Sequence, residues 1–135
     1  MIKKIDHIGI AVRDLEIQKQ FYCDVMGLEC TGIEEVPDQK VIAAIIPVGD
    51  VRIELLQPTA EDSPIARFLE KRGEGIHHIA YLVTGLEDNL RYMEEKEIQL
   101  IDKQPRPGAG GHLIAFLHPK STGGVLTELC EHEGE

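Results

Sequence analysis

The chain has 135 residues, a length that fits one compact domain. Its 24 acidic and 14 basic residues give a formal net charge of −10, and no basic stripe stands out from that background. Hydrophobic residues make up 42% of the chain, yet no segment approaches the roughly 20 apolar residues that cross a bilayer. We therefore expect a cytoplasmic protein with neither a nucleic-acid partner nor a membrane partner.

The first part of the chain reads as a strand, a helix and three further strands. Apolar and β-branched residues predict a strand over 5–12. Asp14 is placed to cap a helix over 15–26, and Gly27 follows where a helix commonly ends. Three extended segments complete this part, at 28–36, 40–47 and 51–57.

The second part repeats this order after a short linker helix at about 63–72. Pro64 suits the first position of that helix, and Gly73 suits its end. The elements predicted after it are a strand at 76–83, a helix near 86–96, a strand near 98–103, a strand at 112–118 and a last strand ending at Glu131.

The chain also repeats itself at the level of residues. The pattern DHIGIAV at 6–12 returns as HHIAYLV at 77–83, and VRIELL at 51–56 returns as VLTELC at 125–130. We therefore predict an α+β fold: a single domain, 1–135, built from two tandem βαβββ modules at about 3–58 and 75–132. Either module alone is too small to bury much surface.

Each module carries a histidine at the matching place on its first strand and a glutamate at the matching place on its last strand. Two modules related by a pseudo-twofold axis would bring these four side chains to a common centre. Two imidazoles and two carboxylates suit a divalent Zn, Co, Ni or Mn ion, and a six-coordinate shell would leave two positions for a chelating substrate. The predicted ligands are His7, Glu54, His78 and Glu128.

A simpler interpretation exists for every histidine. A lone strand histidine is more often a hydrogen-bonded structural residue than a ligand, and only the recurrence in both modules favours metal binding. His77 points to the opposite face from His78, so we expect a structural or exposed residue. His112, His118 and His132 are expected to lie at the surface or to form hydrogen bonds. The cysteines form no CxxC pair, which argues against a disulfide framework and a thiolate zinc site.

Five stretches carry a resemblance to a known superfamily: DHIGIAV at 6–12, IELLQP at 53–58, DSPIARFL at 62–69, GIHHIA at 75–80, and FLHPK followed by GGVLTEL within 116–129. They resemble the vicinal oxygen chelate (glyoxalase/bleomycin resistance) superfamily, and within it the methylmalonyl-CoA epimerases. The likeness runs nearly from end to end of the chain.

The resemblance implies a half-barrel with a central metal cleft and an acyl-CoA substrate. It implies a metal-dependent epimerase that interconverts (R)- and (S)-methylmalonyl-CoA by abstracting the α-proton through a metal-stabilised enolate. Residue by residue, His7, Glu54, His78 and Glu128 fall on the metal-ligand positions, and Glu128 also falls on a catalytic base. Members of the superfamily often pair, so we expect a homodimer.

One position departs from the epimerase pattern. Such enzymes carry a second acid on the strand before the Glu54 strand, and the matching position here is Ala43. We hypothesise that Glu54 supplies the missing proton carrier, so that Glu54 and Glu128 are both catalytic.

Two other functions compete with the epimerase. A glyoxalase I-like lactoylglutathione lyase would use the same ligand set, but this chain has Ala11 and Pro58 where that relative binds glutathione through arginine and asparagine. The same modules also serve as non-catalytic small-molecule binding proteins, which commonly lack the four ligands.

Overall fold

The computed structural model describes residues 2–132, and the chain divides into two compact units. One unit is His7–His77. The other combines the described residues up to Asp6 with those from His78 onward. The division therefore runs through two strands, β1 (Ile2–Ala11) and β5 (Gly75–Val83), each of which contributes to both units.

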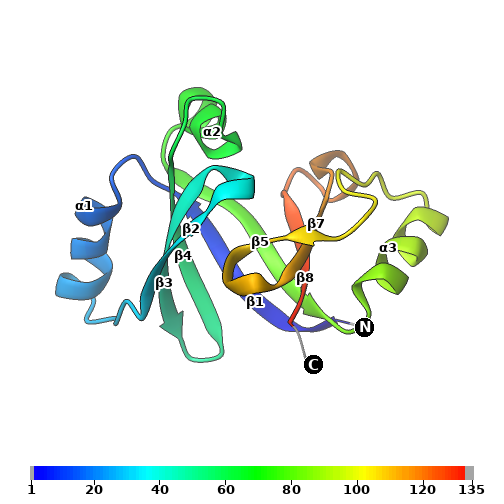
Figure 1. Cartoon of the computed structure of the whole chain (residues 1–135), viewed down its shortest axis with the longest axis horizontal. Coiled ribbons are helices and arrows are strands. Elements are labelled where there is room, and N and C mark those ends of the chain that lie inside the picture. Colours follow the sequence, from blue (N-terminus) through cyan, green and yellow to red (C-terminus); the bar gives the residue numbers. More distant parts are fainter. Residues whose placement is uncertain (1, 133–135) are drawn as a thin grey trace. The chain divides into compact units, whose positions relative to one another are not determined.

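The unit His7–His77 is built on four hydrogen-bonded strands in the order β2-β3-β4-β1. Strand β3 is antiparallel to both β2 and β4, whereas β1 and β4 are parallel. Helix α1 (Leu15–Lys19) follows β1, and Figure 1 shows it beside β3 and β4. The other strand bounds are Gly32–Val36 for β2, Val41–Val48 for β3 and Val51–Pro58 for β4.

Helix α1 begins as the sequence predicts and then changes its geometry. The Asp14 carboxylate accepts a hydrogen bond from the Ile17 N–H at 3.1 Å, which confirms the predicted cap. A π-helical segment continues from Gln20 to Val25, and Gly27 follows with a φ of 78°. Glycine adopts this left-handed conformation at little cost, so the chain turns away from the helix there.

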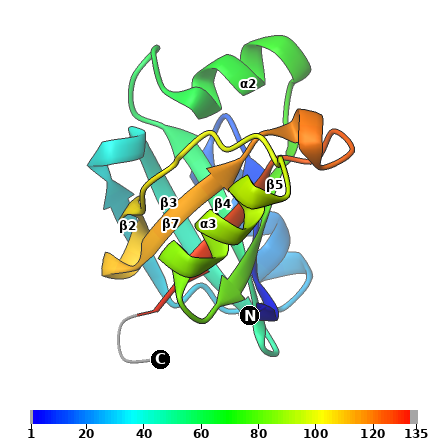
Figure 2. The same ribbon diagram turned by 90° about the vertical axis from the view of Figure 1, so that its right-hand side faces the viewer.

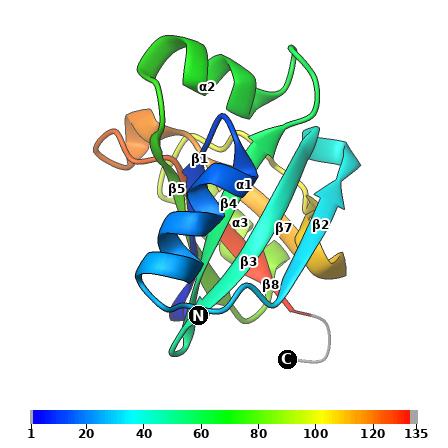
Figure 3. The same ribbon diagram turned by 90° about the vertical axis from the view of Figure 1, so that its left-hand side faces the viewer.

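One face of this sheet packs against α1, and the opposite face carries polar groups. Alternation along β1 and β4 separates Val12 and Leu55, which face α1, from His7 and Glu54, which do not. Figure 3 shows α1 in front of the strands of this unit. The buried cluster on that side comprises Val12, Leu15, Ala44, Ile46 and Leu55.

Helix α2 (Pro64–Arg72) closes this unit between β4 and β5. The Ser63 hydroxyl accepts a hydrogen bond from the Ile65 N–H at 3.1 Å and caps the helix. Gly73 follows the last turn with a φ of 77°. Both ends of α2 therefore lie where the sequence signals place them.

In the other unit the strands after β5 are hydrogen-bonded in the order β5-β8-β7-β6, and β1 lies next to β5. Strand β8 is parallel to β5 and antiparallel to β7. Helix α3 lies against β7 and β8 in Figure 2. The bounds are Leu86–Glu95 for α3, Arg106–Pro107 for β6, Leu113–Leu117 for β7 and Thr127–Glu131 for β8.

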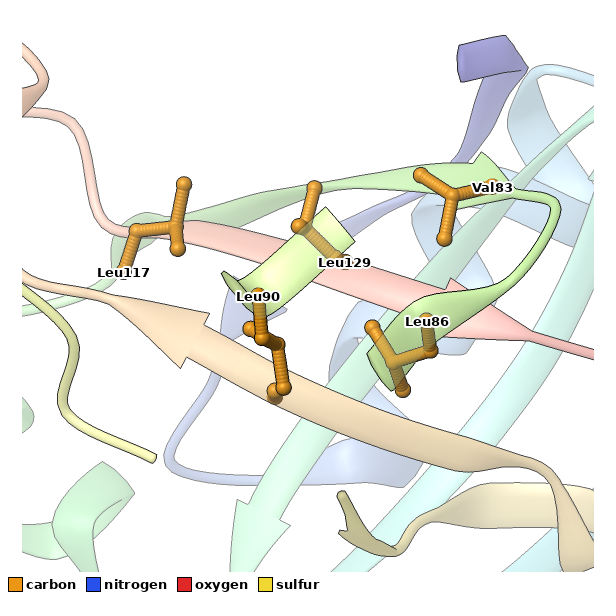
Figure 4. Packing of buried hydrophobic residues seen from close by; sticks show 6 residues of the cluster. Val83, Leu86, Leu90, Leu117 and Leu129 are labelled. Carbon is orange, nitrogen blue, oxygen red and sulfur yellow. The ribbon is translucent and has the colours of Figure 1, made fainter. Parts of the chain in front are cut away.

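Apolar side chains from α3 and three strands form the core of this unit. Figure 4 shows five of them converging: Val83, Leu86, Leu90, Leu117 and Leu129. Leu86 is fully buried, and Leu129 is 1% exposed. This packing holds α3 on one face and leaves the opposite face of the strands for His78 and Glu128.

The strand predicted near 98–103 is wrong. Within that stretch only Leu100 makes a β-bridge, to Leu117, and the short strand β6 lies further along the chain. The Asp102 carboxylate instead accepts a hydrogen bond from the Phe116 N–H at 2.9 Å, a side-chain contact that interrupts regular pairing. Apart from this element, the β-α-β-β-β order of both halves and the α+β class are confirmed.

None of the helices among residues 2–132 is both long enough and apolar enough to span a bilayer.

Candidate metal-binding and catalytic site

Two of the four predicted ligands lie together in the unit His7–His77. Glu54 on β4 is opposite Gly9 on β1, and His7 lies two residues before Gly9 on the same face. Gly9 has no side chain to fill the space, so the two polar groups meet across it. His7 Nδ1 is 3.5 Å from Glu54 Oε2, and both side chains are buried.

Arg52 joins this pair, a contact that the sequence analysis missed. It lies opposite His7 in the register of β1 and β4, and its Nη2 is 3.1 Å from Glu54 Oε2. A signal was available, because Arg52 and Glu54 are two residues apart on one strand and so share a face. The guanidinium restrains the carboxylate oxygen that also faces His7.

The other two predicted ligands lie together in the second unit. Glu128 on β8 is opposite Ala80 on β5, and His78 lies two residues before Ala80. His78 Nε2 is 3.3 Å from Glu128 Oε1. Each of the two side chains is 4% exposed or less.

The two pairs are therefore built in the same way. In each, a histidine lies two residues before a small residue that faces the glutamate on a parallel neighbouring strand. Ligand atoms lie about 2.0–2.2 Å from zinc, so two donors on one tetrahedral ion are about 3.4 Å apart. The separations of 3.5 Å and 3.3 Å fit that requirement, so either pair can supply two ligands to a divalent ion.

An aromatic ring contacts His78, and a cationic side chain lies against that ring. The Phe116 ring meets the His78 ring edge-on, with centroids 5.4 Å apart, and Phe116 is opposite Glu128 in the β7–β8 register. The Arg106 guanidinium lies 5.6 Å from the centre of the Phe116 ring. An Asp102 oxygen holds Arg106 Nε at 3.1 Å. No pattern in the sequence pointed to a role for Phe116 or Arg106.

Ala43 occupies the position where the sequence analysis expected a second acid, and it carries no polar side chain. Ala43 on β3 is fully buried, with Leu56 of β4 opposite it on one side and Glu34 of β2 opposite it on the other. Directly opposite residues share a face of the sheet, so the Glu34 carboxylate belongs to the same face as Ala43.

His77 is structural, one of the two roles expected for it. Its ring packs edge-on against Phe68, with centroids 5.1 Å apart, in the unit that does not contain His78. Burial lowers the pKa of His77 to about 4, because the charged imidazolium loses water there. His77 is therefore neutral at physiological pH.

Comparisons with known proteins agree with this architecture. Residues 6–116 match the family described as the glyoxalase/bleomycin resistance protein/dioxygenase superfamily. The uncharacterized protein YqjC of Bacillus subtilis is 46% identical over 99% of this chain and 96% of its own length. The ethylmalonyl-CoA/methylmalonyl-CoA epimerase of Cereibacter sphaeroides is 39% identical over 96% of this chain and 98% of its own length.

A solved structure gives the same result for the fold. A methylmalonyl-CoA epimerase in complex with methylmalonyl-CoA and NH4+ is 36% identical, covers 99% of this chain and 97% of its own, and superposes with a TM-score of 0.95. The vicinal-oxygen-chelate fold expected from the sequence is confirmed.

Proposed function

The chain belongs to the glyoxalase/bleomycin resistance protein/dioxygenase superfamily, and on that premise we propose that it is a metal-dependent methylmalonyl-CoA epimerase. The observation that carries the proposal is the identical register of the two histidine–glutamate pairs, each buried and each with the spacing of metal ligands. Relatives with that activity at 35–39% identity support the choice of reaction.

We propose that the two pairs together hold one divalent Co, Mn, Ni or Zn ion through His7, Glu54, His78 and Glu128. When bound, such an ion withdraws electron density from the thioester carbonyl of the substrate and makes its α-proton more acidic. Imidazole and carboxylate are ligands that these ions accept, and all four side chains are buried.

The two glutamates then divide the proton transfer between them. Glu128, as a carboxylate, removes the α-proton from one face of the substrate, and Glu54, in its protonated form, gives its proton to the other face. Both groups then return to their starting states by exchanging protons with solvent. The cross-strand neighbours of Glu128 are the apolar Ala80 and Phe116, whereas Glu54 is held by Arg52. The attraction of Arg52 opposes movement of Glu54 toward a substrate, so Glu128 is the more mobile base.

The reaction is tested by incubation with methylmalonyl-CoA in deuterated water, with and without a chelator. Starting from a single epimer, we expect deuterium at the α-carbon and conversion to a mixture of both epimers, each abolished by the chelator and restored by a divalent ion. The hemithioacetal of methylglyoxal and glutathione serves as the control substrate. Turnover of that substrate without exchange into methylmalonyl-CoA would replace the epimerase proposal with the lyase.

The role of Glu54 needs a separate comparison. Glu54→Gln should leave exchange of the α-proton from one epimer largely intact while epimerisation is lost. Glu34→Gln is the matched variant, because Glu34 lies opposite Ala43 on the same face. If Glu34→Gln separates exchange from epimerisation and Glu54→Gln does not, then Glu34 is the second proton carrier.

A homodimeric assembly and a cytoplasmic location remain predictions from the sequence. Light scattering on the purified protein measures the mass of the assembly directly. A mass of one chain would contradict the homodimer.

A further inference from the structure

A second group of metal-ligand side chains lies outside the proposed epimerase site. Oxygen, sulfur and nitrogen atoms of Asp6, Cys130 and His132 all lie within 4.8 Å of one another. All three residues belong to the unit that combines the start of β1 with the chain from His78 onward. From this juxtaposition we propose that Asp6, Cys130 and His132 form a separate binding site for a thiophilic divalent ion, with zinc as the best match.

The donor set is chemically suited to such an ion. Zinc accepts thiolate, imidazole and carboxylate ligands together, and three protein ligands leave a fourth position for water. The thiolate also makes this group chemically different from the two histidine–glutamate pairs, whose donor atoms are only nitrogen and oxygen. Soft sulfur ligands favour zinc, whereas manganese prefers oxygen donors.

The surroundings hold the three side chains in place. Asp6 is 1% exposed and Cys130 is 2% exposed, so both donors are already desolvated. His132 Nε2 is 3.0 Å from Asp6 Oδ1, and the His112 ring stacks on the His132 ring with centroids 3.9 Å apart. His112 therefore fixes the plane of the His132 imidazole, as a positioning residue.

Binding of the ion requires the release of protons. The Cys130 thiol loses its proton to solvent, and the resulting thiolate binds the metal. Any proton shared between Asp6 and His132 must also leave, since the ion takes its place. The water in the fourth position keeps its protons, and no electrons are transferred. Binding of the ion therefore requires no oxidant or other reactant.

The experiment uses cobalt(II) as a spectroscopic substitute for zinc in the full chain. A thiolate bound to cobalt gives a near-ultraviolet charge-transfer band, which nitrogen and oxygen ligands do not give. We expect the band to saturate as cobalt is added, to disappear on addition of zinc, and to be absent in Cys130→Ser. The double variant Cys23→Ser/Cys30→Ser is the matched control and should keep the band, because both of these cysteines lie in the other unit.

Two further variants test whether all three residues bind the ion. Asp6→Asn and His132→Gln should each weaken cobalt binding at least tenfold, roughly the loss that even outer-shell partners of a metal cause. Of the two variants, His132→Gln is the less disruptive to folding, because His132 is partly exposed and follows the last strand. Circular dichroism checks the fold of each variant.

The outcomes distinguish this site from the epimerase site. His78→Ala should keep the band, so a failure of metal binding at the epimerase ligands leaves the test unaffected. The proposal is overturned by the absence of a band in the wild-type protein, by a band that survives Cys130→Ser, or by unchanged affinity in both Asp6→Asn and His132→Gln.

Discussion

At the scale of single residues, the two glutamates of the proposed site differ in what surrounds them. Glu54 Oε2 is within 3.1 Å of the Arg52 guanidinium and 3.5 Å of His7, so two cationic or hydrogen-bonding groups hold one oxygen. Glu128 lies between the strands that carry Ala80 and Phe116 and meets His78 through its Oε1. This asymmetry is why we assign the first proton transfer to Glu128.

The assignment predicts the effect of Glu128→Gln. Glutamine keeps a carbonyl oxygen that can bind the ion, but it cannot accept the α-proton. We expect α-proton exchange to fall by about 10²–10⁴-fold while the metal content of the protein is retained. Glu35→Gln is the control, because Glu35 is exposed on β2 and should leave exchange unchanged. Normal exchange in Glu128→Gln would rule out Glu128 as the base.

The lowered pKa of His77 predicts how the free energy of unfolding depends on pH. Its pKa is about 4 in the folded chain, below the ordinary 6.5, so the unfolded chain binds a proton more readily. The stabilisation by neutral His77 is fully present above pH 6.5 and is lost as the pH falls toward 4. Between pH 7 and pH 5 we expect a loss of about 2 kcal/mol in the free energy of unfolding.

The measurement is urea unfolding of the wild-type chain and of His77→Phe at both pH values. Phenylalanine preserves the edge-on contact with Phe68 but does not titrate. The variant should therefore lose less stability on acidification than the wild-type chain. Equal losses in the two proteins would show that His77 does not contribute.

At the scale of elements, a side chain from a distant strand caps the start of α3. The Glu131 carboxylate at the end of β8 accepts hydrogen bonds from the Gly85 N–H at 3.0 Å and the Leu86 N–H at 3.4 Å. A negative charge at a helix N-terminus satisfies free N–H groups and opposes the positive end of the helix dipole. This contact joins the last strand of the unit to its helix.

We expect Glu131→Ala to lower the free energy of unfolding by about 1 kcal/mol, the size of a lost helix cap. Glu95→Ala is the matched control, because Glu95 is exposed at the other end of α3 and makes no favourable contact with the dipole there. Thermal unfolding of both variants measures the difference. A larger effect of Glu95→Ala would contradict the capping role.

The elements also show where prediction from the sequence succeeds and where it fails. The limits of α2 were predictable, because Ser63, Pro64 and Gly73 act on their nearest neighbours. The stretch 98–103 was not, because its apolar residues favour a strand while the contact of Asp102 with Phe116 forms only in the folded unit. The contact of Glu131 with α3 was missed for the same reason.

Across the chain as a whole, a single ion at the proposed site needs both His7 and His78 as ligands. Manganese isolates this site, because it prefers nitrogen and oxygen donors to thiolate. A free ion concentration of 100 times Kd should stabilise the wild-type chain by about 2.7 kcal/mol. His7→Ala and His78→Ala should each lose this gain, since each removes a ligand of the same ion.

Thermal unfolding with manganese and with chelator provides the measurement. Titration of the purified protein should give about one manganese ion per chain. If His7→Ala and His78→Ala each keep half of the binding, the two pairs bind separate ions, and the single-ion proposal is wrong.

The duplication, the α+β class and the four candidate ligands can be predicted from the order of the amino acids alone. These follow from local patterns: strand alternation with a period of two, and a repeated histidine and glutamate at matching places. The folded structure was needed to place Phe116 against His78 and to bring Asp6 beside Cys130 and His132. These contacts depend on strand register, because hydrogen bonding between strands that are distant in the chain selects which side chains become neighbours.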